Sequence, residues 1–388
     1  MPQIPVINCS GCTACYNACP VSAIKMVENH EGFSYPLVLK EMCINCGKCE
    51  KVCPSINPPV LEDKYYGGFV AQSESSDVLN QSTSGGFIDA LCKHVIEDLK
   101  GVAVGAVFDD DFLPKHIIAE NYETAKLFRG SKYAQSNLGD IFKQTENILK
   151  SEKYVLFIGT PCQVAGLHTY LNKAYNNLIT VDMVCRSIPS GKLWREYLNW
   201  QEKRYNSKVK AVSFRKKTYG YHSGALEILF QNGKRYSGSN RVDYYMKSFH
   251  GDICSRSSCY NCEFKTAHRI SDFTVFDCWS PEKVAMGELV DNDKGYSNII
   301  LNSQNSTNIL ENISGVKFIK ANPEKMLEFV GGMATESIKY KPARAVYYKD
   351  IEALGFINGA KKHIKVSAKD KVIERLKPIR YALKKPFK

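Results

Sequence analysis

Residues 9–20, CSGCTACYNACP, place four cysteines at the spacing C-x-x-C-x-x-C-x-x-x-C and end in a proline. Residues 43–54, CINCGKCEKVCP, repeat this spacing and end in proline as well. The doubled run is typical of a bacterial ferredoxin with two 4Fe–4S clusters, in which the fourth cysteine of each run ligates the other run's cluster. It predicts one cluster on Cys9, Cys12, Cys15 and Cys53, and a second on Cys43, Cys46, Cys49 and Cys19.

Two other uses of these cysteines fit the sequence less well. Zinc knuckles would need only the C-x-x-C pairs. Disulfides would need an oxidising compartment, yet residues 1–5 lack the charged start of a secretion signal. Fifteen cysteines in such a chain indicate metal binding in a reducing cytoplasm, and no apolar run approaches the ~18 residues of a membrane span.

The charge of the chain is concentrated near its end. The formal net charge is +12, and three 4Fe–4S centres at about −2 each would reduce it to roughly +6. Residues 361–388 hold eleven Lys or Arg against two acids, which gives +9. Because no nucleic-acid-binding motif accompanies these cations, we expect no nucleic-acid partner, and we consider peripheral contact through a basic tail instead.

Residues 55–63, SINPPVLED, indicate a linker. Beyond it, apolar runs alternate with helical patterns, so the fold class is predicted as α+β or α/β. We expect a ferredoxin domain at 1–57, a mixed α/β domain in two parts at 64–145 and 146–335, and a basic helical tail at 336–388. Strands are predicted at 65–71, 102–108, 154–158, 178–184, 208–215, 225–230, 272–279, 299–301 and 316–319, and helices at 87–100, 164–171 and 367–377.

Three polar stretches of the α/β domain are candidate ligand sites, and each also has a structural interpretation. Ser84-Gly85-Gly86 precedes a helix and either presents amides to an anion or caps that helix. Residues 128–133, FRGSKY, either hold a phosphate or flavin ring or form a turn. Arg215-Lys216-Lys217 is either a solvated edge or a docking point for an anionic substrate.

A second group of cysteines suggests a third metal centre. Cys254, Cys259 and Cys262 lie within nine residues, and a fourth ligand would come from Cys162 or Cys185, which both end predicted strands. A zinc knuckle is the alternative. Cys162 also precedes a helix that carries His168, so a Cys/His nucleophilic pair is a further alternative, although no orienting third residue is evident.

These residues resemble the family of beta subunits of coenzyme F420 hydrogenases and dehydrogenases over about 65–320. The resemblance rests on the order of Ser84-Gly85-Gly86, Gly130 to Tyr133, Gly159 to Gln163, Val184-Cys185, and Ser258 to Cys262 followed by Ser271-Asp272. It implies a flavin- and iron–sulfur-binding domain. The implied flavin contacts are Ser84, Gly85, Gly86, Gly130, Ser131, Lys132 and Tyr133, and the implied cluster ligands are Cys162, Cys185, Cys259 and Cys262, with Cys254 in reserve.

The sequence departs from the family pattern at two places. Arg186-Ser187 follow Cys185 where many relatives have His-Gly, and Phe276 and Ser280 replace the two glycines around Asp277-Cys278-Trp279. Glycine allows a close approach of backbone to ligand, so Phe276 and Ser280 are expected to reshape the pocket, which leaves the F420 substrate open.

We therefore expect a cytoplasmic iron–sulfur flavoprotein. It would pass electrons between three 4Fe–4S clusters and FAD, and exchange a hydride with coenzyme F420 or a similar organic substrate. Two alternatives stay open: a ferredoxin-dependent reductase of a sugar or quinone-like intermediate, and a non-catalytic relay subunit of a larger redox complex. The expected partners are a redox protein or ferredoxin and a small organic hydride carrier.

Overall fold

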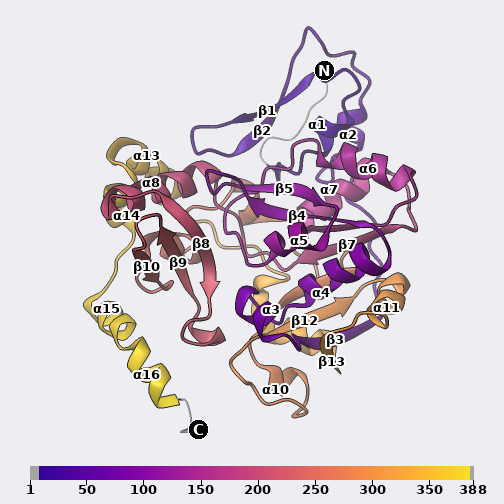
Figure 1. The fold of residues 1–388 in the computed structure, drawn as a ribbon. Coiled ribbons are helices and arrows are strands. Elements are labelled where there is room, and N and C mark those ends of the chain that lie inside the picture. Colours follow the sequence, from indigo (N-terminus) through magenta and orange to yellow (C-terminus); the bar gives the residue numbers. More distant parts are fainter. Residues whose placement is uncertain (1–7, 385–388) are drawn as a thin grey trace.

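The computed structural model describes residues 8–384. The start of the chain at residues 1–5 and the last cations of the basic tail therefore lie outside the described residues. A small domain at the N-terminal end sits on one side of a much larger mixed α/β body (Figure 1). The predicted fold class, a two-cluster ferredoxin domain followed by a mixed α/β domain, is confirmed.

The small domain is built around its cysteine runs. Strands β1 (Ile24–Glu28) and β2 (Ser34–Val38) form an antiparallel hairpin beside two short helices, α1 (Ala14–Ala18) and α2 (Lys48–Lys51). Each helix follows a residue in the left-handed region, Thr13 at φ 65° and Gly47 at φ 69°. These sharp turns fold each C-x-x-C run back on itself.

The large body is organised on an eight-stranded sheet in the order β13-β3-β12-β11-β7-β6-β4-β5. β4, β6, β7 and β11 are parallel neighbours, and β3 runs in the same direction because antiparallel β12 separates it from β11. The apolar runs of the sequence are these strands, covered on both faces. Their bounds are β3 Gly67–Ser73, β4 Val102–Phe108, β5 Pro114–Ala119, β6 Val155–Gly159, β7 Leu178–Met183, β11 Phe273–Cys278, β12 Tyr296–Leu301 and β13 Val316–Lys320.

Helices cover both faces of this sheet. α4 (Phe87–Lys93), which continues into a π-helical turn (His94–Asp98), and α11 (Gln304–Leu310) pack on one face. α6 (Ile141–Lys150) and α7 (Pro161–Leu171) pack on the other, together with α12 (Pro323–Val330). Shorter helical segments are α3 Ser76–Gln81, α5 Tyr122–Ala125 with a 3₁₀ turn at Lys126–Phe128, α10 Pro281–Val284, and 3₁₀ turns at Tyr221–Ser223, Ser257–Asn261 and Gly331–Met333.

A second sheet forms beside the first. β8 (Val209–Lys216), β9 (Ala225–Phe230) and β10 (Arg235–Gly238) are antiparallel, and the predicted Asn232-Gly233 turn joins the last two with Gly233 at φ 81°. Their core is aromatic-rich and closed by surrounding helices. These helices are α8 Gly191–Tyr205, α9 Tyr244–His250, α13 Arg344–Leu354 and α14 Phe356–His363; α15 Ala368–Arg375 and α16 Lys377–Lys384 follow. None of the helices among residues 8–384 combines the length and apolar character needed to span a bilayer.

A buried ion pair joins the ferredoxin domain to the large body. Arg344 on α13 donates from Nη1 and Nη2 to the two carboxylate oxygens of Glu31, at 2.6 and 2.5 Å, and both side chains are 7% exposed. The Ser190 hydroxyl at the start of α8 donates to the Glu31 carbonyl at 2.6 Å. Two distant parts of the body therefore hold the turn between β1 and β2.

We expect Arg344→Ala to destabilise the protein by about 3–5 kcal/mol, because it leaves the Glu31 carboxylate buried without its partner. Urea unfolding followed by circular dichroism measures this loss. Lys362→Ala, which breaks the more exposed pair with Asp350 at 2.6 Å, is the matched control and should cost at most about 1 kcal/mol. Equal losses in the two variants would contradict the role given to Arg344.

Candidate iron–sulfur centres and redox site

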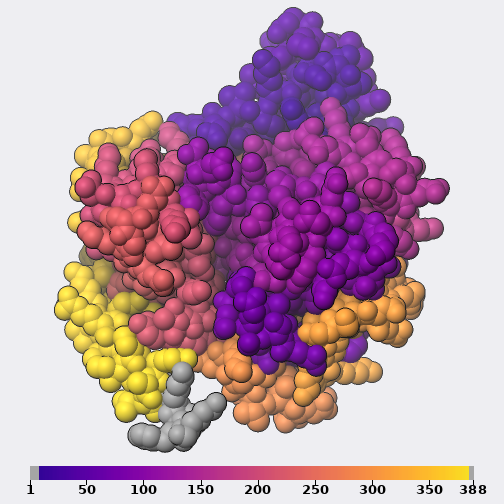
Figure 2. Space-filling model, in the orientation of Figure 1, coloured from indigo at the N-terminus to yellow at the C-terminus, as the bar shows by residue number. Residues whose placement is uncertain are grey.

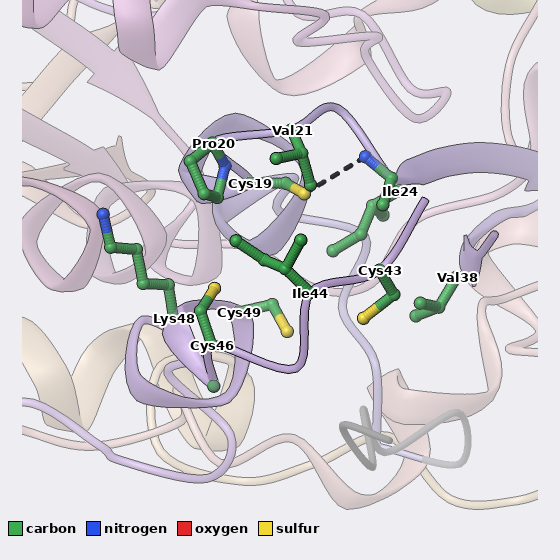
Figure 3. A pocket seen from close by; sticks show the side chains of 12 residues that line it. Cys19, Pro20, Val21, Ile24, Val38, Cys43, Ile44, Cys46, Lys48 and Cys49 are labelled. Atoms are coloured by element: carbon green, nitrogen blue, oxygen red, sulfur yellow. Dashed lines mark hydrogen bonds between the residues drawn. The ribbon is translucent and has the colours of Figure 1, made fainter. Parts of the chain in front are cut away.

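The ferredoxin domain contains two cavities, each lined by cysteines from both runs. Figure 3 shows Cys19, Cys43, Cys46 and Cys49 around one of them, where the Ala23 N–H donates to Cys19 Sγ at 3.2 Å. The second cavity is lined by Cys9, Cys12, Cys15 and Cys53. These are the two crossed ligand sets that the spacing predicts. All fifteen cysteines are free thiols, so the described residues offer eight sulfurs to two 4Fe–4S clusters.

The two cavities differ in their exposure. Cys46 is exposed, whereas Cys12 and Cys15 are buried at 8% exposure each. Burial, reinforced by Cys9, Cys162 and Cys53, raises the pKa of the Cys12 thiol to about 12. A bound iron cluster would supply the positive charge that lets such buried thiols ionise. The cavity around Cys46 therefore faces the outside, and the cavity around Cys12 faces the large body.

The third cysteine group gathers at the carboxyl edge of the main sheet. Cys162 follows β6 and Cys185 follows β7, and because these strands are parallel, both residues reach the same edge. The loop with Cys259 and Cys262 arrives there from the chain after α9. Burial and then Cys259 and Cys162 raise the pKa of Cys185, so the thiols lie within electrostatic reach of one another. Burial and then Cys262 likewise raise the pKa of Cys162 to about 11.

The other candidates for this centre lie elsewhere. Cys254 is fully buried in the core of the second sheet, and its carbonyl accepts from the Tyr348 hydroxyl at 2.7 Å. His168 contacts Thr180 at 3.5 Å, whereas Cys162 Sγ lies 3.2 Å from Thr160 Oγ1. Among residues 8–384, no group of three or more His, Cys, Asp or Glu side chains is arranged around a single metal ion. A 4Fe–4S cluster binds one thiolate at each of its four irons, so its four cysteines are spaced more widely than the ligands of a single metal ion.

Arg256 is a buried cation between the cavity lined by Cys9 and Cys12 and the third cysteine group, and sequence analysis missed it. Its side chain is fully buried and donates to the Cys9 carbonyl at 2.6 Å, the Ser34 carbonyl at 2.9 Å and Gln135 Oε1 at 3.0 Å. Nη2 also lies 3.7 Å from Cys9 Sγ. Its charge opposes the rise in pKa of Cys162. The sequence feature that could have pointed to this residue is the presence of an arginine inside the cysteine-rich segment Cys254–Cys262.

The cavity lined by Cys9 and Cys12 and the third cysteine group are close neighbours. A Cβ atom at Gly166 on α7 would lie 2.9 Å from Cys12 Sγ, so glycine is what allows α1 to approach this helix. Ser10 lies near enough to Cys162 to hydrogen-bond to its thiol. Lys265 adds a second cation at the third group, since Nζ donates to the Cys185 carbonyl. The three cysteine groups therefore form a series from the exposed cavity to the sheet edge.

The predicted flavin segments also meet at this edge. Thr83 Oγ1 lies 3.0 Å from Ser131 Oγ and accepts from the Ser131 N–H at 2.8 Å, which joins the Ser84 and Gly130 loops. Lys217 donates to the Ser84 carbonyl at 2.7 Å and brings in the end of β8. The Ser84 loop, the Gly130 loop and the end of β8, which are far apart in sequence, thus lie side by side.

Several groups of these loops already form hydrogen bonds or close packing contacts with the protein itself. The Gly85 N–H donates to Ser297 Oγ at 3.0 Å, and a Cβ on Gly85 would lie 2.2 Å from the Ala71 carbonyl, so this glycine serves close packing. Lys132 Nζ donates to the Gly130 carbonyl at 3.1 Å and to three preceding carbonyls, and burial lowers its pKa to about 8. By contrast, a Cβ on Gly130 would meet nothing closer than 3.9 Å. Ser84 Oγ donates to the Tyr296 carbonyl at 2.5 Å, and Gly86 precedes α4 at φ 85°. The other predicted contacts are Gly130, Ser131 and the Tyr133 ring, which stacks on Phe249 at 4.9 Å.

An aromatic and cationic cluster follows β11 at the same edge. Arg215 pairs with Asp277 at 3.1 Å and lies 4.7 Å from the Trp279 ring, which stacks on Tyr221 at 4.7 Å. The cluster therefore combines a cation that Asp277 orients with aromatic rings at the end of β11.

Of the two departures from the glycine pattern, Phe276 does not reach this cluster. It is buried with Val70, Cys278 and Val284 on the opposite face of the sheet. Alternation along β11 directs Asp277 toward Arg215 instead. The expectation that Phe276 reshapes the pocket is therefore wrong. Arg186, the other departure, pairs with Asp252 at 2.8 Å and does not face the flavin segments directly.

Three cysteine groups in series, with buried cations between them, define an iron–sulfur redox protein. Residues 8–56 match the family model of the 4Fe-4S dicluster domain. Residues 152–326 match the family model for the C terminus of the coenzyme F420 hydrogenase/dehydrogenase beta subunit. The chain is therefore similar to this family of beta subunits over residues 152–326, and it carries a dicluster domain at its N-terminal end.

Several known proteins are similar to this chain at low identity. An uncharacterized protein of Methanocaldococcus jannaschii is 23% identical, with 76% of this chain and 84% of that protein covered. The coenzyme F420-dependent sulfite reductase of the same organism is 24% identical, with 78% and 45% covered. The F subunit of the F(420)H(2) dehydrogenase of Methanosarcina mazei is 24% identical, with 48% and 63% covered. A chain of the F420-reducing [NiFe] hydrogenase complex from Methanosarcina barkeri aligns at TM-score 0.45 and 16% identity, with 83% and 96% covered.

We expect protein prepared without oxygen to contain about twelve irons per chain, from three four-iron clusters. Cys185→Ser and Cys262→Ser should each lower the count by about four. Cys254→Ser, a buried cysteine outside the group, should leave it unchanged. Iron and sulfide assays measure the counts; about eight irons plus zinc in the parent protein would make the third centre a zinc site.

Replacing Arg256 by Gln should lower the reduction potential of an adjacent cluster by on the order of 100 mV. A nearby positive charge stabilises the reduced, more negative state by about 2–3 kcal/mol at an effective dielectric constant near 20, and 59 mV corresponds to a tenfold change. Redox titration followed by electron paramagnetic resonance measures the potential. Arg256→Lys retains the charge and should shift it much less; similar shifts in both variants would contradict the electrostatic role.

Proposed function

We propose that this protein is a 4Fe–4S- and FAD-dependent oxidoreductase that exchanges electrons with a redox partner and a hydride with an organic substrate. The observation that carries this proposal is the convergence at one sheet edge. Cys162 and Cys185 follow adjacent parallel strands, and the Arg215–Trp279 cluster lies where the end of β8, from the second sheet, meets the carboxyl end of β11. Ligands of open α/β sheets bind at the carboxyl ends of such strands.

The residues of the chain have distinct parts in this proposal. Cysteines of the ferredoxin domain and of the sheet edge would hold three clusters, which carry single electrons. A flavin bound beside them would couple these electrons to two-electron hydride chemistry. Trp279 and Tyr133 offer aromatic faces to a planar ring. Arg215, oriented by Asp277, offers a cation to an anionic group of the ligand.

The relatives favour a deazaflavin as the hydride carrier, since the sulfite reductase and the dehydrogenase component both carry F420 in their names. The chain spans about half of that reductase and under two thirds of that component, so their whole activities are not carried over to it. We therefore retain a ferredoxin-dependent reductase of a sugar or quinone-like compound as the second candidate. A reducing cytoplasm suits fifteen free thiols.

The exposed cavity around Cys46 is the proposed entry point for electrons. Ile44 beside it is 61% exposed and Met42 is 43% exposed, so a small redox protein could approach this cluster closely. The same arrangement would serve a relay role within a larger complex. The two cases differ in whether the isolated chain reacts with an organic substrate.

The proposal predicts that the anaerobic protein binds about one FAD per chain and couples a viologen dye to coenzyme F420. Arg215→Met should raise KM for the anionic carrier about 10–100-fold, since a charge-assisted hydrogen bond contributes about 1.5–3 kcal/mol. Arg235→Met, at an exposed arginine of β10, is the matched control. Failure to bind flavin would reject the proposal, whereas flavin binding without F420 turnover would favour the second candidate or a relay role.

A further inference from the structure

The last two helices of the described chain act as one nearly continuous helix. α15 begins at a capping box in which Ser367 Oγ accepts from the Asp370 N–H at 3.0 Å. Across the junction with α16, the Leu376 N–H donates to the Val372 carbonyl and the Arg380 N–H donates to the Leu376 carbonyl, both at 3.0 Å. Pro378 lies in the first turn of α16, where a missing N–H is tolerated. The helical periodicity therefore continues from 368 to 384.

The polar face of this helix pair lies against the protein. Glu374 accepts from the Ser239 N–H at 3.0 Å and from the Ser239 hydroxyl at 2.6 Å, and it also pairs with Lys377 at 3.1 Å. Tyr381 makes an edge contact with Tyr219 at 6.0 Å. Asp370 lies 3.9 Å from Lys247. These inward residues, Asp370, Glu374, Lys377 and Tyr381, recur at helical spacing.

The apolar face points away from the protein. Val372, Leu376, Ile379 and Leu383 are 53%, 43%, 57% and 81% exposed. Each is two residues from an inward residue, and two residues on an α-helix are separated by about 200°. The usual arrangement of a surface helix is thus inverted, and no described part of the chain covers this stripe.

The charges next to the stripe are all positive. Lys369 and Arg380 lie on one side of it, Lys371 and Arg375 lie on the other, and all four are exposed. The two acids of this segment, Asp370 and Glu374, are on the inward face. Apolar residues flanked by lysine and arginine are the pattern of a helix that lies in the plane of an anionic membrane surface.

We propose that α15 and α16 form a peripheral docking surface for anionic phospholipid. The apolar stripe would enter the boundary between headgroups and acyl chains, while the flanking cations contact phosphate and carboxylate groups. The Ser239–Glu374 contacts hold the helix along the protein, at one margin of the molecule in Figures 1 and 2. A lipid surface fits better than a protein helix because it supplies negative charge on both sides of the stripe. This proposal is independent of the flavin chemistry.

The test uses the full-length protein with its clusters and vesicles of phosphatidylcholine with or without about 30% phosphatidylserine. We expect flotation with the anionic vesicles, at least tenfold weaker binding to neutral ones, and loss of binding as salt is raised. The double variant Ile379→Asp/Leu383→Asp should reduce binding at least tenfold, and Arg375→Glu/Arg380→Glu should do the same. Val60→Asp, at a residue 92% exposed in the linker after the ferredoxin domain, is the matched control.

Iron content and circular dichroism verify that each variant is folded, since the substituted side chains are exposed. No binding to anionic vesicles at low salt would overturn the proposal. Equal binding by Ile379→Asp/Leu383→Asp and Val60→Asp would also overturn it. Flotation that requires an added partner protein would show the stripe to be a protein interface instead.

Discussion

The direction of the strands is the constraint on which the rest of the structure depends. Because β3, β4, β6, β7 and β11 run the same way, every segment that leaves a carboxyl end arrives at one edge of the sheet. Cysteines 162 and 185, the Ser84 loop and the Asp277–Trp279 segment are brought together for this reason alone. No local sequence feature would place them within one site.

The second constraint is electrostatic. Thiols and iron clusters carry negative charge, and the interface between the ferredoxin domain and the sheet edge excludes water from Cys12 and Arg256. A buried charge is tolerated only when it is paired and hydrogen-bonded. Arg256 meets this condition through three oxygen acceptors, and Arg344 meets it through Glu31. Arg256 therefore both joins the ferredoxin domain to the large body and places a positive charge beside Cys9 and Cys162.

Sequence patterns correctly predicted the features that depend on residues close together in the chain. The strands 102–108 and 225–230 have the predicted bounds, and the Asn232-Gly233 turn joins two antiparallel strands. The cysteine spacing predicted the crossed lining of both ferredoxin cavities. Arg256 could not be predicted, because its partners at residues 9, 34 and 135 become neighbours only in the folded chain. The error at Phe276 has a related cause: the alternation of a strand decides which neighbour faces a site.

The two ferredoxin cavities are unequally shielded from water, and this difference should decide which of them is oxidised first. Oxidants dissolved in water reach the exposed Cys46 directly, whereas Cys12 is buried beside α7. Damage should begin at the exposed cavity while the buried cavity stays intact. Repair could then be limited to reloading one site at the surface, without separating the domains.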